Sequence, residues 1–281
     1  MEPKVVVTMT SWKGRISHLA KQIFIFFKTQ TVKPDIFYLW LAEEEFPKKE
    51  ESLPENLLLI CEGLGVKIRW TEKNEFCFKR WHVYPEHYND LVISIDDDIL
   101  FDANLIKEAR KHINERNISY NIFKDLTFRH GFNRNNTRIY DYRESRSIYY
   151  RFLGCSVICP NTFPLRCLDK NLLLLREKIN RRQDEQWIKA FMVMNATKIS
   201  FLNFSYKSCA IAKLANENST WSHFYKKYNG FRVEDYQMYM TLASLPMLMD
   251  AWKKTFPEFD SKIFENEGLG KIKALLKSNG C

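Results

Sequence analysis

Short apolar runs alternate with longer amphipathic stretches along most of the chain. A short apolar run bounded by polar, Gly or Pro residues is typical of a strand, and apolar residues that recur every three or four positions are typical of a helix. The runs that predict strands are 4–9, 35–41, 66–70, 91–95 and 198–202, and the stretches that predict helices are 16–29, 53–62, 171–179 and 184–195. This alternation predicts an α/β fold with a mostly parallel central sheet flanked by helices.

The remaining segments carry weaker patterns. We expect a helix that Asp102 caps and that runs to about residue 114, a long loop over 119–146, and a strand pair at the sheet edge over 147–159. The last part of the chain reads as helical, with helices over 235–251 and 261–277. We therefore predict a domain of residues 1–205 and a helical C-terminal extension of residues 206–281.

The segment with the clearest chemistry is Asp96-Asp97-Asp98, which directly follows the apolar run Leu91–Ile95. Such a run predicts a buried parallel strand, and open α/β sheets bind ligands at the carboxyl ends of their strands. Adjacent carboxylates repel one another unless a cation or donors offset the charge. Hard oxygen ligands select Mg²⁺ or Mn²⁺, which also bind substrate phosphates. The alternative is an exposed acidic turn.

The alternation of side chains along an extended segment assigns different roles within this acidic triplet. If residues 96–98 stay extended, Asp96 and Asp98 face one side and Asp97 faces the other. The outer pair can then serve a metal ion and a ribose, while the middle residue anchors the loop. We expect Asp98 to be the direct metal ligand.

The net charge of +9 favours anionic partners, which include nucleic acid, a phospholipid surface and phosphorylated substrates. Nucleic-acid binding would need basic residues interleaved with aromatics. The closest approach is the cluster of Tyr140, Tyr142, Arg143, Arg146, Tyr149, Tyr150 and Arg151. That cluster can equally flank a cleft for a phosphorylated ligand or form a solvated face, and we expect no nucleic-acid partner.

Cysteines and apolar segments bear on the compartment. The seven cysteines have no zinc-type spacing, and we expect reduced thiols. Neither a signal peptide nor an apolar run of about 18 residues is recognisable, so the expected location is cytoplasmic. The last predicted helix has an apolar stripe beside Lys271, Lys273 and Lys277. It suits peripheral contact with an anionic membrane, or packing on the core or on another subunit.

The first strand and its loop, which include Thr10, Ser11 and Arg15, resemble those of bacterial polysaccharide glycosyltransferases of the GT-A (Rossmann-like) fold. The acidic triplet and the segment Phe78-Lys79-Arg80 extend the resemblance over roughly residues 4–200. The resemblance implies transfer of galactofuranose or another hexose from a nucleotide sugar, with UDP favoured as the carrier. The implied acceptor is a surface-polysaccharide or lipid-linked glycan.

The resemblance also implies roles for individual residues. The loop after the first strand would hold the nucleotide beside a helix N-terminus, and Lys79 and Arg80 would neutralise its diphosphate, although each of these side chains fits a plain surface position as well. The implied metal ligands are Asp96, Asp98 and His223. The implied nucleotide-binding residues are Thr8, Thr10, Ser11, Arg15, Lys79, Asp96 and Asp97.

A second acidic pair, Asp184-Glu185, precedes Trp187 and resembles the Asp-Asp-x-Trp motif of the same enzymes. A carboxylate here would take the proton from the acceptor hydroxyl, which slightly favours inversion of configuration. Glu at the second position leaves open which residue is the base. The alternative is helix capping, with Asp184 as the cap. In the same family a small-residue stretch such as Gly154-Cys155-Ser156 lets a sugar approach the backbone.

Two other functions use the same residues. A phosphohydrolase or nucleotidyltransferase could employ the acidic triplet, but Leu100 stands where a dehalogenase-type phosphatase has Thr or Val. Gly14 alone is thin support for the glycine-rich loop of a nucleotidyltransferase. A non-catalytic protein that binds nucleotides or carbohydrates is the third reading, against which the pair Asp184-Glu185 argues weakly.

Overall fold

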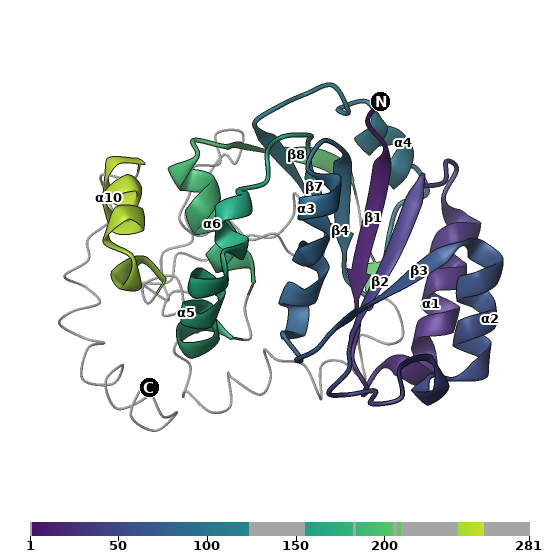
Figure 1. The fold of residues 1–281 in the computed structure, drawn as a ribbon. Coiled ribbons are helices and arrows are strands. Elements are labelled where there is room, and N and C mark those ends of the chain that lie inside the picture. The colour runs from purple at the N-terminus through teal and green to yellow at the C-terminus, as the bar shows by residue number, and fades with distance from the viewer. Residues whose placement is uncertain (1, 124–154, 182–183, 205–206, 209–240, 256–281) are drawn as a thin grey trace, which may run out of the picture.

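The computed structural model describes residues 2–123, 155–181, 184–204, 207–208 and 241–255. Its centre is a seven-stranded sheet in the order β3-β2-β1-β4-β7-β6-β8 (Figure 1). β7 runs antiparallel to both of its neighbours, and the other strand pairs are parallel. The strands are β1 (Val5–Thr10), β2 (Ile36–Ala42), β3 (Val66–Thr71), β4 (Leu91–Ile95), β6 (Ile118–Phe123), β7 (Cys155–Ile158) and β8 (Lys198–Phe204), and a separate ladder joins β5 (Ile99–Leu100) to β9 (Lys207–Ser208).

Helices cover both faces of the sheet (Figure 1). One apolar core lies against α1 (Ile16–Thr29), α2 (Glu55–Leu64) and α4 (Leu105–Arg110). The opposite core is formed with the 3₁₀ segment η2 (Phe76–Val83) and with α3 (Tyr84–His87), α6 (Glu185–Met194) and α10 (Pro246–Thr255), and α5 (Lys170–Asn180) packs beside it. Two further 3₁₀ segments are η1 (Lys49–Ser52) and η4 (Leu165–Leu168). The chain is therefore a layered α/β protein, as its sequence predicts.

Burial on both faces explains why the central strands are continuous apolar runs. In β1, Val5 and Val7 enter the core under α1, and Val6 enters the opposite core. In β4 every residue is buried, and Ser94 is its only polar member. A strand covered on both faces needs apolar residues at odd and even positions alike.

The strand order reverses between β1 and β4. The chain passes outward from β1 through β2 to β3 and then returns to place β4 on the other side of β1. β1 and β4 are parallel neighbours, with Met9 opposite Ile95. Their carboxyl ends therefore flank a topological switch point, which is where open α/β sheets bind ligands. The fold places the loop after β1 and the acidic triplet at this position.

Local pattern predicted the regular elements well. The strands expected near β1, β2, β3, β4 and β8, and the helices expected near α1, α2, α5 and α6, are all present, with ends that differ by at most a few residues. α2 ends at Gly65, whose φ of 68° places it in the left-handed region. Glycine adopts that conformation without steric cost, and its N–H closes the last turn of the helix.

Three expectations for the middle of the chain were wrong. Asp102 does not cap a helix, because its side chain accepts the N–H of Asn104 at 2.8 Å and closes a local turn before α4, which ends at Arg110. Part of the predicted loop forms β6, and β7 lies between β4 and β6 rather than at an edge. Non-local pairing decided both outcomes, since neither segment has a strong pattern of its own. Residues 124–154 lie outside the described part.

The helix expected over 235–251 is not continuous. Residues 241–244 are helical, and α10 starts afresh at Pro246, because proline lacks the N–H that a helix interior needs and restricts the residue before it. α10 packs against α6, with Lys189 Nζ 5.7 Å from the Trp252 ring. The boundary near 205 stays a prediction, and the helix expected over 261–277 lies outside the described residues. In the described part, no helix has the length and apolar character to cross a membrane.

Candidate active site

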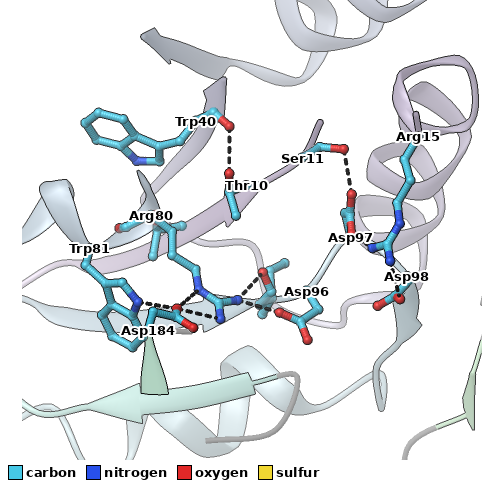
Figure 2. Close-up of polar contacts among 12 residues, drawn as sticks. Thr10, Ser11, Arg15, Trp40, Arg80, Trp81, Asp96, Asp97, Asp98 and Asp184 are labelled. Carbon is cyan, nitrogen blue, oxygen red and sulfur yellow. Dashed lines mark hydrogen bonds and ion pairs between the residues drawn. The ribbon is translucent and has the colours of Figure 1, made fainter. Parts of the chain in front are cut away.

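Asp97 is the anchored member of the acidic triplet. Its side chain is only 5% exposed, Ser11 Oγ donates a hydrogen bond to Oδ2 at 2.5 Å, and Arg15 Nη1 donates to Oδ1 (Figure 2). Ser11 follows β1 directly, and Arg15 immediately precedes α1. Asp97 thus ties the loop after β4 to the loop after β1, across two neighbouring strands.

Asp98 is more accessible and has an incomplete charge balance. Its side chain is 21% exposed, and Arg15 Nη2 lies 3.2 Å from Oδ2. Burial and the negative charge of Asp96 raise the pKa of Asp98 to about 7, although Arg15 opposes the rise. Burial disfavours the ionised form of a carboxyl group, and a neighbouring negative charge disfavours it further. A bound cation would favour the ionised form of Asp98.

Asp96 is the most exposed of the three, at 32%, and its Oδ1 lies 2.5 Å from Arg80 Nη1. Arg80 is 3% exposed, and its Nε and Nη2 donate to Asp184 Oδ2 at 3.2 and 3.0 Å. Burial opposes the charge of Arg80, but Asp184 and Asp96 hold the pKa of the guanidinium well above its usual value. Arg80 is therefore a fixed cation between two carboxylates, as Figure 2 shows.

Asp184 lies immediately before α6, but its side chain makes no capping hydrogen bond. Its Oδ2 instead accepts from Trp81 Nε1 at 2.5 Å in addition to Arg80. Capping therefore does not explain this side chain. Glu185 is the first residue of α6 and is partly buried. The structure brings the second acidic pair to the same end of the sheet as the triplet, through Arg80.

The other predicted nucleotide-binding residues lie around this cluster in different ways. Thr10 donates to the Trp40 carbonyl oxygen at 3.0 Å, at the carboxyl ends of β1 and β2. Thr8 is fully buried, and its hydroxyl donates to the Arg80 carbonyl oxygen at 3.0 Å, so it supports Arg80 from beneath. Lys79 Nζ is directed to Asn74 Oδ1 at 3.1 Å and lies 3.9 Å from Glu45. Burial lowers the pKa of Lys79.

Several predicted residues lie outside the described part, namely His223, Gly154 and the Arg–Tyr cluster of residues 140–151. Sequence reasoning missed Trp81, which donates to Asp184 across 103 positions. Trp81 directly follows Phe78-Lys79-Arg80 in the chain. A tryptophan beside a basic pair does not indicate that a distant carboxylate is its partner. The packing of η2 against β1 and β2 brings Trp81 to Asp184.

The donor chemistry of the site fits a divalent cation. Asp96 and Asp98 offer hard oxygen ligands, both are partly exposed, and the pKa of Asp98 is raised by burial and by the charge of Asp96. In the described part of the chain, no group of three or more His, Cys, Asp or Glu side chains forms a complete metal site. A cation held here would draw its remaining ligands from substrate oxygens and water, as Mg²⁺ commonly does.

No family model matches the chain, and no curated protein matches it. Solved structures similar to it include S. aureus TarS 1-349 in complex with UDP-GlcNAc, at 15% identity and a TM-score of 0.45, which covers 98% of this chain and 79% of that chain. The mannosyltransferase PcManGT from Pyrobaculum calidifontis, in complex with GDP-Man and Mn²⁺, is 10% identical with a TM-score of 0.44, over 99% and 82% of the two chains. The glycosyltransferase GlyE of Streptococcus pneumoniae is 13% identical with a TM-score of 0.42, over 90% and 63%.

Proposed function

We propose that the chain is a metal-dependent glycosyltransferase that moves a hexose from a nucleotide sugar, with UDP the favoured nucleotide, to a hydroxyl of a surface-polysaccharide or lipid-linked glycan. The observation that carries the proposal is that the three carboxylates of the triplet lie in different environments. Asp97 is held by Ser11 and Arg15, while Asp96 and Asp98 stay partly exposed at the switch point. Two carboxylates so placed suit a cation and the diphosphate that comes with it.

The donor half of the site would be built from β1, α1 and β4. Asp96 and Asp98 would hold Mg²⁺ or Mn²⁺, and the ion, when bound, neutralises the charge of the diphosphate leaving group. Arg15 lies at the start of α1, where the N–H groups of the first turn and the positive end of the helix dipole would favour a phosphate. Thr10 ends β1, and Ser11 begins the loop that contacts the triplet, where the ribose and base would bind.

The acceptor half would lie at the start of α6. The acceptor hydroxyl oxygen forms a bond to the anomeric carbon as the bond from that carbon to the diphosphate oxygen breaks. The hydroxyl proton passes to a carboxylate of the pair Asp184-Glu185, and the nucleoside diphosphate leaves with the electron pair of the broken bond. A single displacement of this kind inverts the configuration.

Thermal unfolding with Mn²⁺, with UDP and with both tests the proposal. We expect the pair to raise the unfolding temperature beyond the effect of either alone, because ligands that bind only the folded state stabilise it. Asp98→Ala should abolish the joint effect. Asp35→Ala is the matched control, since Asp35 pairs with Arg110 and accepts from Val5 at the opposite end of β1.

A screen of sugar nucleotides for hydrolysis and transfer would identify the donor. If saturating Mn²⁺ and UDP produce no shift in the wild-type protein, and no sugar nucleotide is turned over, the proposed function is wrong. If the Asp98→Ala and Asp35→Ala variants respond alike to the two ligands, the triplet is not the binding site.

A further inference from the structure

The buried guanidinium of Arg80 bridges the two halves of the site. Its Nη1 contacts Asp96 at 2.5 Å, and its Nε and Nη2 contact Asp184 at 3.2 and 3.0 Å (Figure 2). The carbonyl oxygen of Arg80 is fixed by Thr8, and its guanidinium carbon lies 5.5 Å from the Trp81 ring. Because Arg80 is only 3% exposed, water cannot replace these contacts in stabilising its charge.

The surroundings of Asp184 differ from those of a proton acceptor. A general base must lie within hydrogen-bond reach of the hydroxyl that it deprotonates. Asp184 is 4% exposed, and its Oδ2 already accepts from three N–H groups, two on Arg80 and one on Trp81. These contacts hold Oδ2 of Asp184 against Arg80 and Trp81.

We propose that Asp184 is a positioning residue that keeps Arg80 paired when a divalent cation takes Asp96, and is not the group that accepts the proton from the acceptor. The inference rests on the proposed function. A buried guanidinium that loses its carboxylate partner is strongly destabilising. Because Arg80 contacts two carboxylates, Asp96 can bind a cation while Asp184 still balances the charge of the Arg80 guanidinium.

This arrangement couples the donor half of the site to the start of α6. In the described part of the chain, removing the charge of Asp184 leaves Asp96 as the remaining carboxylate partner of Arg80. A cation that binds Asp96 must then compete with the full pairing energy between Arg80 and Asp96. The cost therefore falls on cation and nucleotide binding. The proton-accepting role passes to Glu185, the neighbouring carboxylate, which begins α6.

Isothermal titration of UDP in the presence and absence of Mn²⁺ separates the two roles. We expect Asp184→Asn to weaken the Mn²⁺-dependent affinity for UDP by about tenfold or more, the range typical of residues that support a metal ligand. Glu185→Gln should leave that affinity within about twofold of wild type and remove turnover of the donor found in the sugar-nucleotide screen. Asp90→Asn is the matched control, because Asp90 also has two hydrogen-bond partners, the buried His87 and the exposed Lys4 amide, away from the triplet.

If Asp184→Asn leaves the Mn²⁺-dependent affinity unchanged and abolishes turnover, Asp184 is the base and the inference is overturned. Arg80→Lys gives a second measurement if Asp184→Asn does not fold, since lysine keeps the charge but cannot contact both carboxylates. It should weaken the same affinity by about tenfold or more, and unchanged affinity would overturn the inference. Failure of the wild-type protein to bind UDP with Mn²⁺ is a separate result, which counts against the proposed function.

Discussion

Neutralising the middle and the last carboxylate of the triplet should have opposite effects on stability. Asp97→Asn keeps an oxygen that can accept from Ser11, but it removes the charge-assisted contact with Arg15 and sets an amide N–H₂ against a guanidinium. A hydrogen bond to a charged group is worth about 1.5–3 kcal/mol. For a chain of this size each kcal/mol moves the thermal unfolding midpoint by about 2–4 °C, so a fall of roughly 3–12 °C is expected.

Asp98→Asn should act in the other direction. The pKa of Asp98 is raised from 3.8 to about 7, so folding disfavours its ionised form, and near pH 8 that carboxylate lowers the stability of the ligand-free protein. Each pKa unit corresponds to about 1.4 kcal/mol. The contact with Arg15 is lost as well, and the expected net gain is therefore on the order of 1 kcal/mol.

Urea unfolding at pH 8 with a chelator present, followed by tryptophan fluorescence, measures both effects without interference from metal ions. Ser11→Ala serves as an internal scale, because it removes one donor to Asp97 and should cost about 1 kcal/mol. Equal losses of stability in Asp97→Asn and Asp98→Asn, or no loss in Asp97→Asn, would refute the assignment of the middle residue as the anchor.

Two further predictions concern the nucleotide loop and the buried thiols. A Cβ atom at Gly14 would lie 2.3 Å from the Trp12 ring, so Gly14→Ala should displace that indole and weaken UDP binding in a titration, with little change in the unfolding midpoint. Burial raises the pKa of Cys61 to about 11 and of Cys159 to about 12, and it raises that of Cys167 as well. These three thiols should react with a disulfide reagent only after urea is added, and rapid labelling of any of the three in the native protein would contradict their burial.

The elements that could be predicted from sequence are those whose pattern is complete within one segment. The helix over 16–29 shows its buried stripe in residues such as Leu19, Ile23 and Phe26, and β4 shows burial on both faces as an unbroken apolar run. β6 and β7 have no such local signal. Their place in the sheet depends on pairing with partners far along the chain, such as β8 and β4, and sequence pattern does not specify partners.

The same distinction applies to the site. The contact of Ser11 and Arg15 with the triplet could be anticipated, because loops that follow neighbouring parallel strands meet at one edge of the sheet. Side-chain alternation predicted an anchoring middle residue only if the segment stayed extended. Residues 97 and 98 form a turn instead, so Asp97 is the anchor because it contacts Ser11 and Arg15 and not because of alternation. The contacts of Arg80 could not be predicted in this way. Its residue type suggested a partner for the diphosphate, but its two carboxylate partners lie 16 and 104 positions away in the sequence.

Charge balance connects these observations. In the described site, four carboxylates, those of Asp96, Asp97, Asp98 and Asp184, share two guanidinium groups, those of Arg15 and Arg80. When all are ionised, two negative charges remain, and burial together with the charge of Asp96 raises the pKa of Asp98. One divalent cation carries the opposite charge. Because Asp97 and Asp184 are fixed by buried donors, the excess resides on Asp96 and Asp98, the two residues that remain accessible to a cation and a diphosphate.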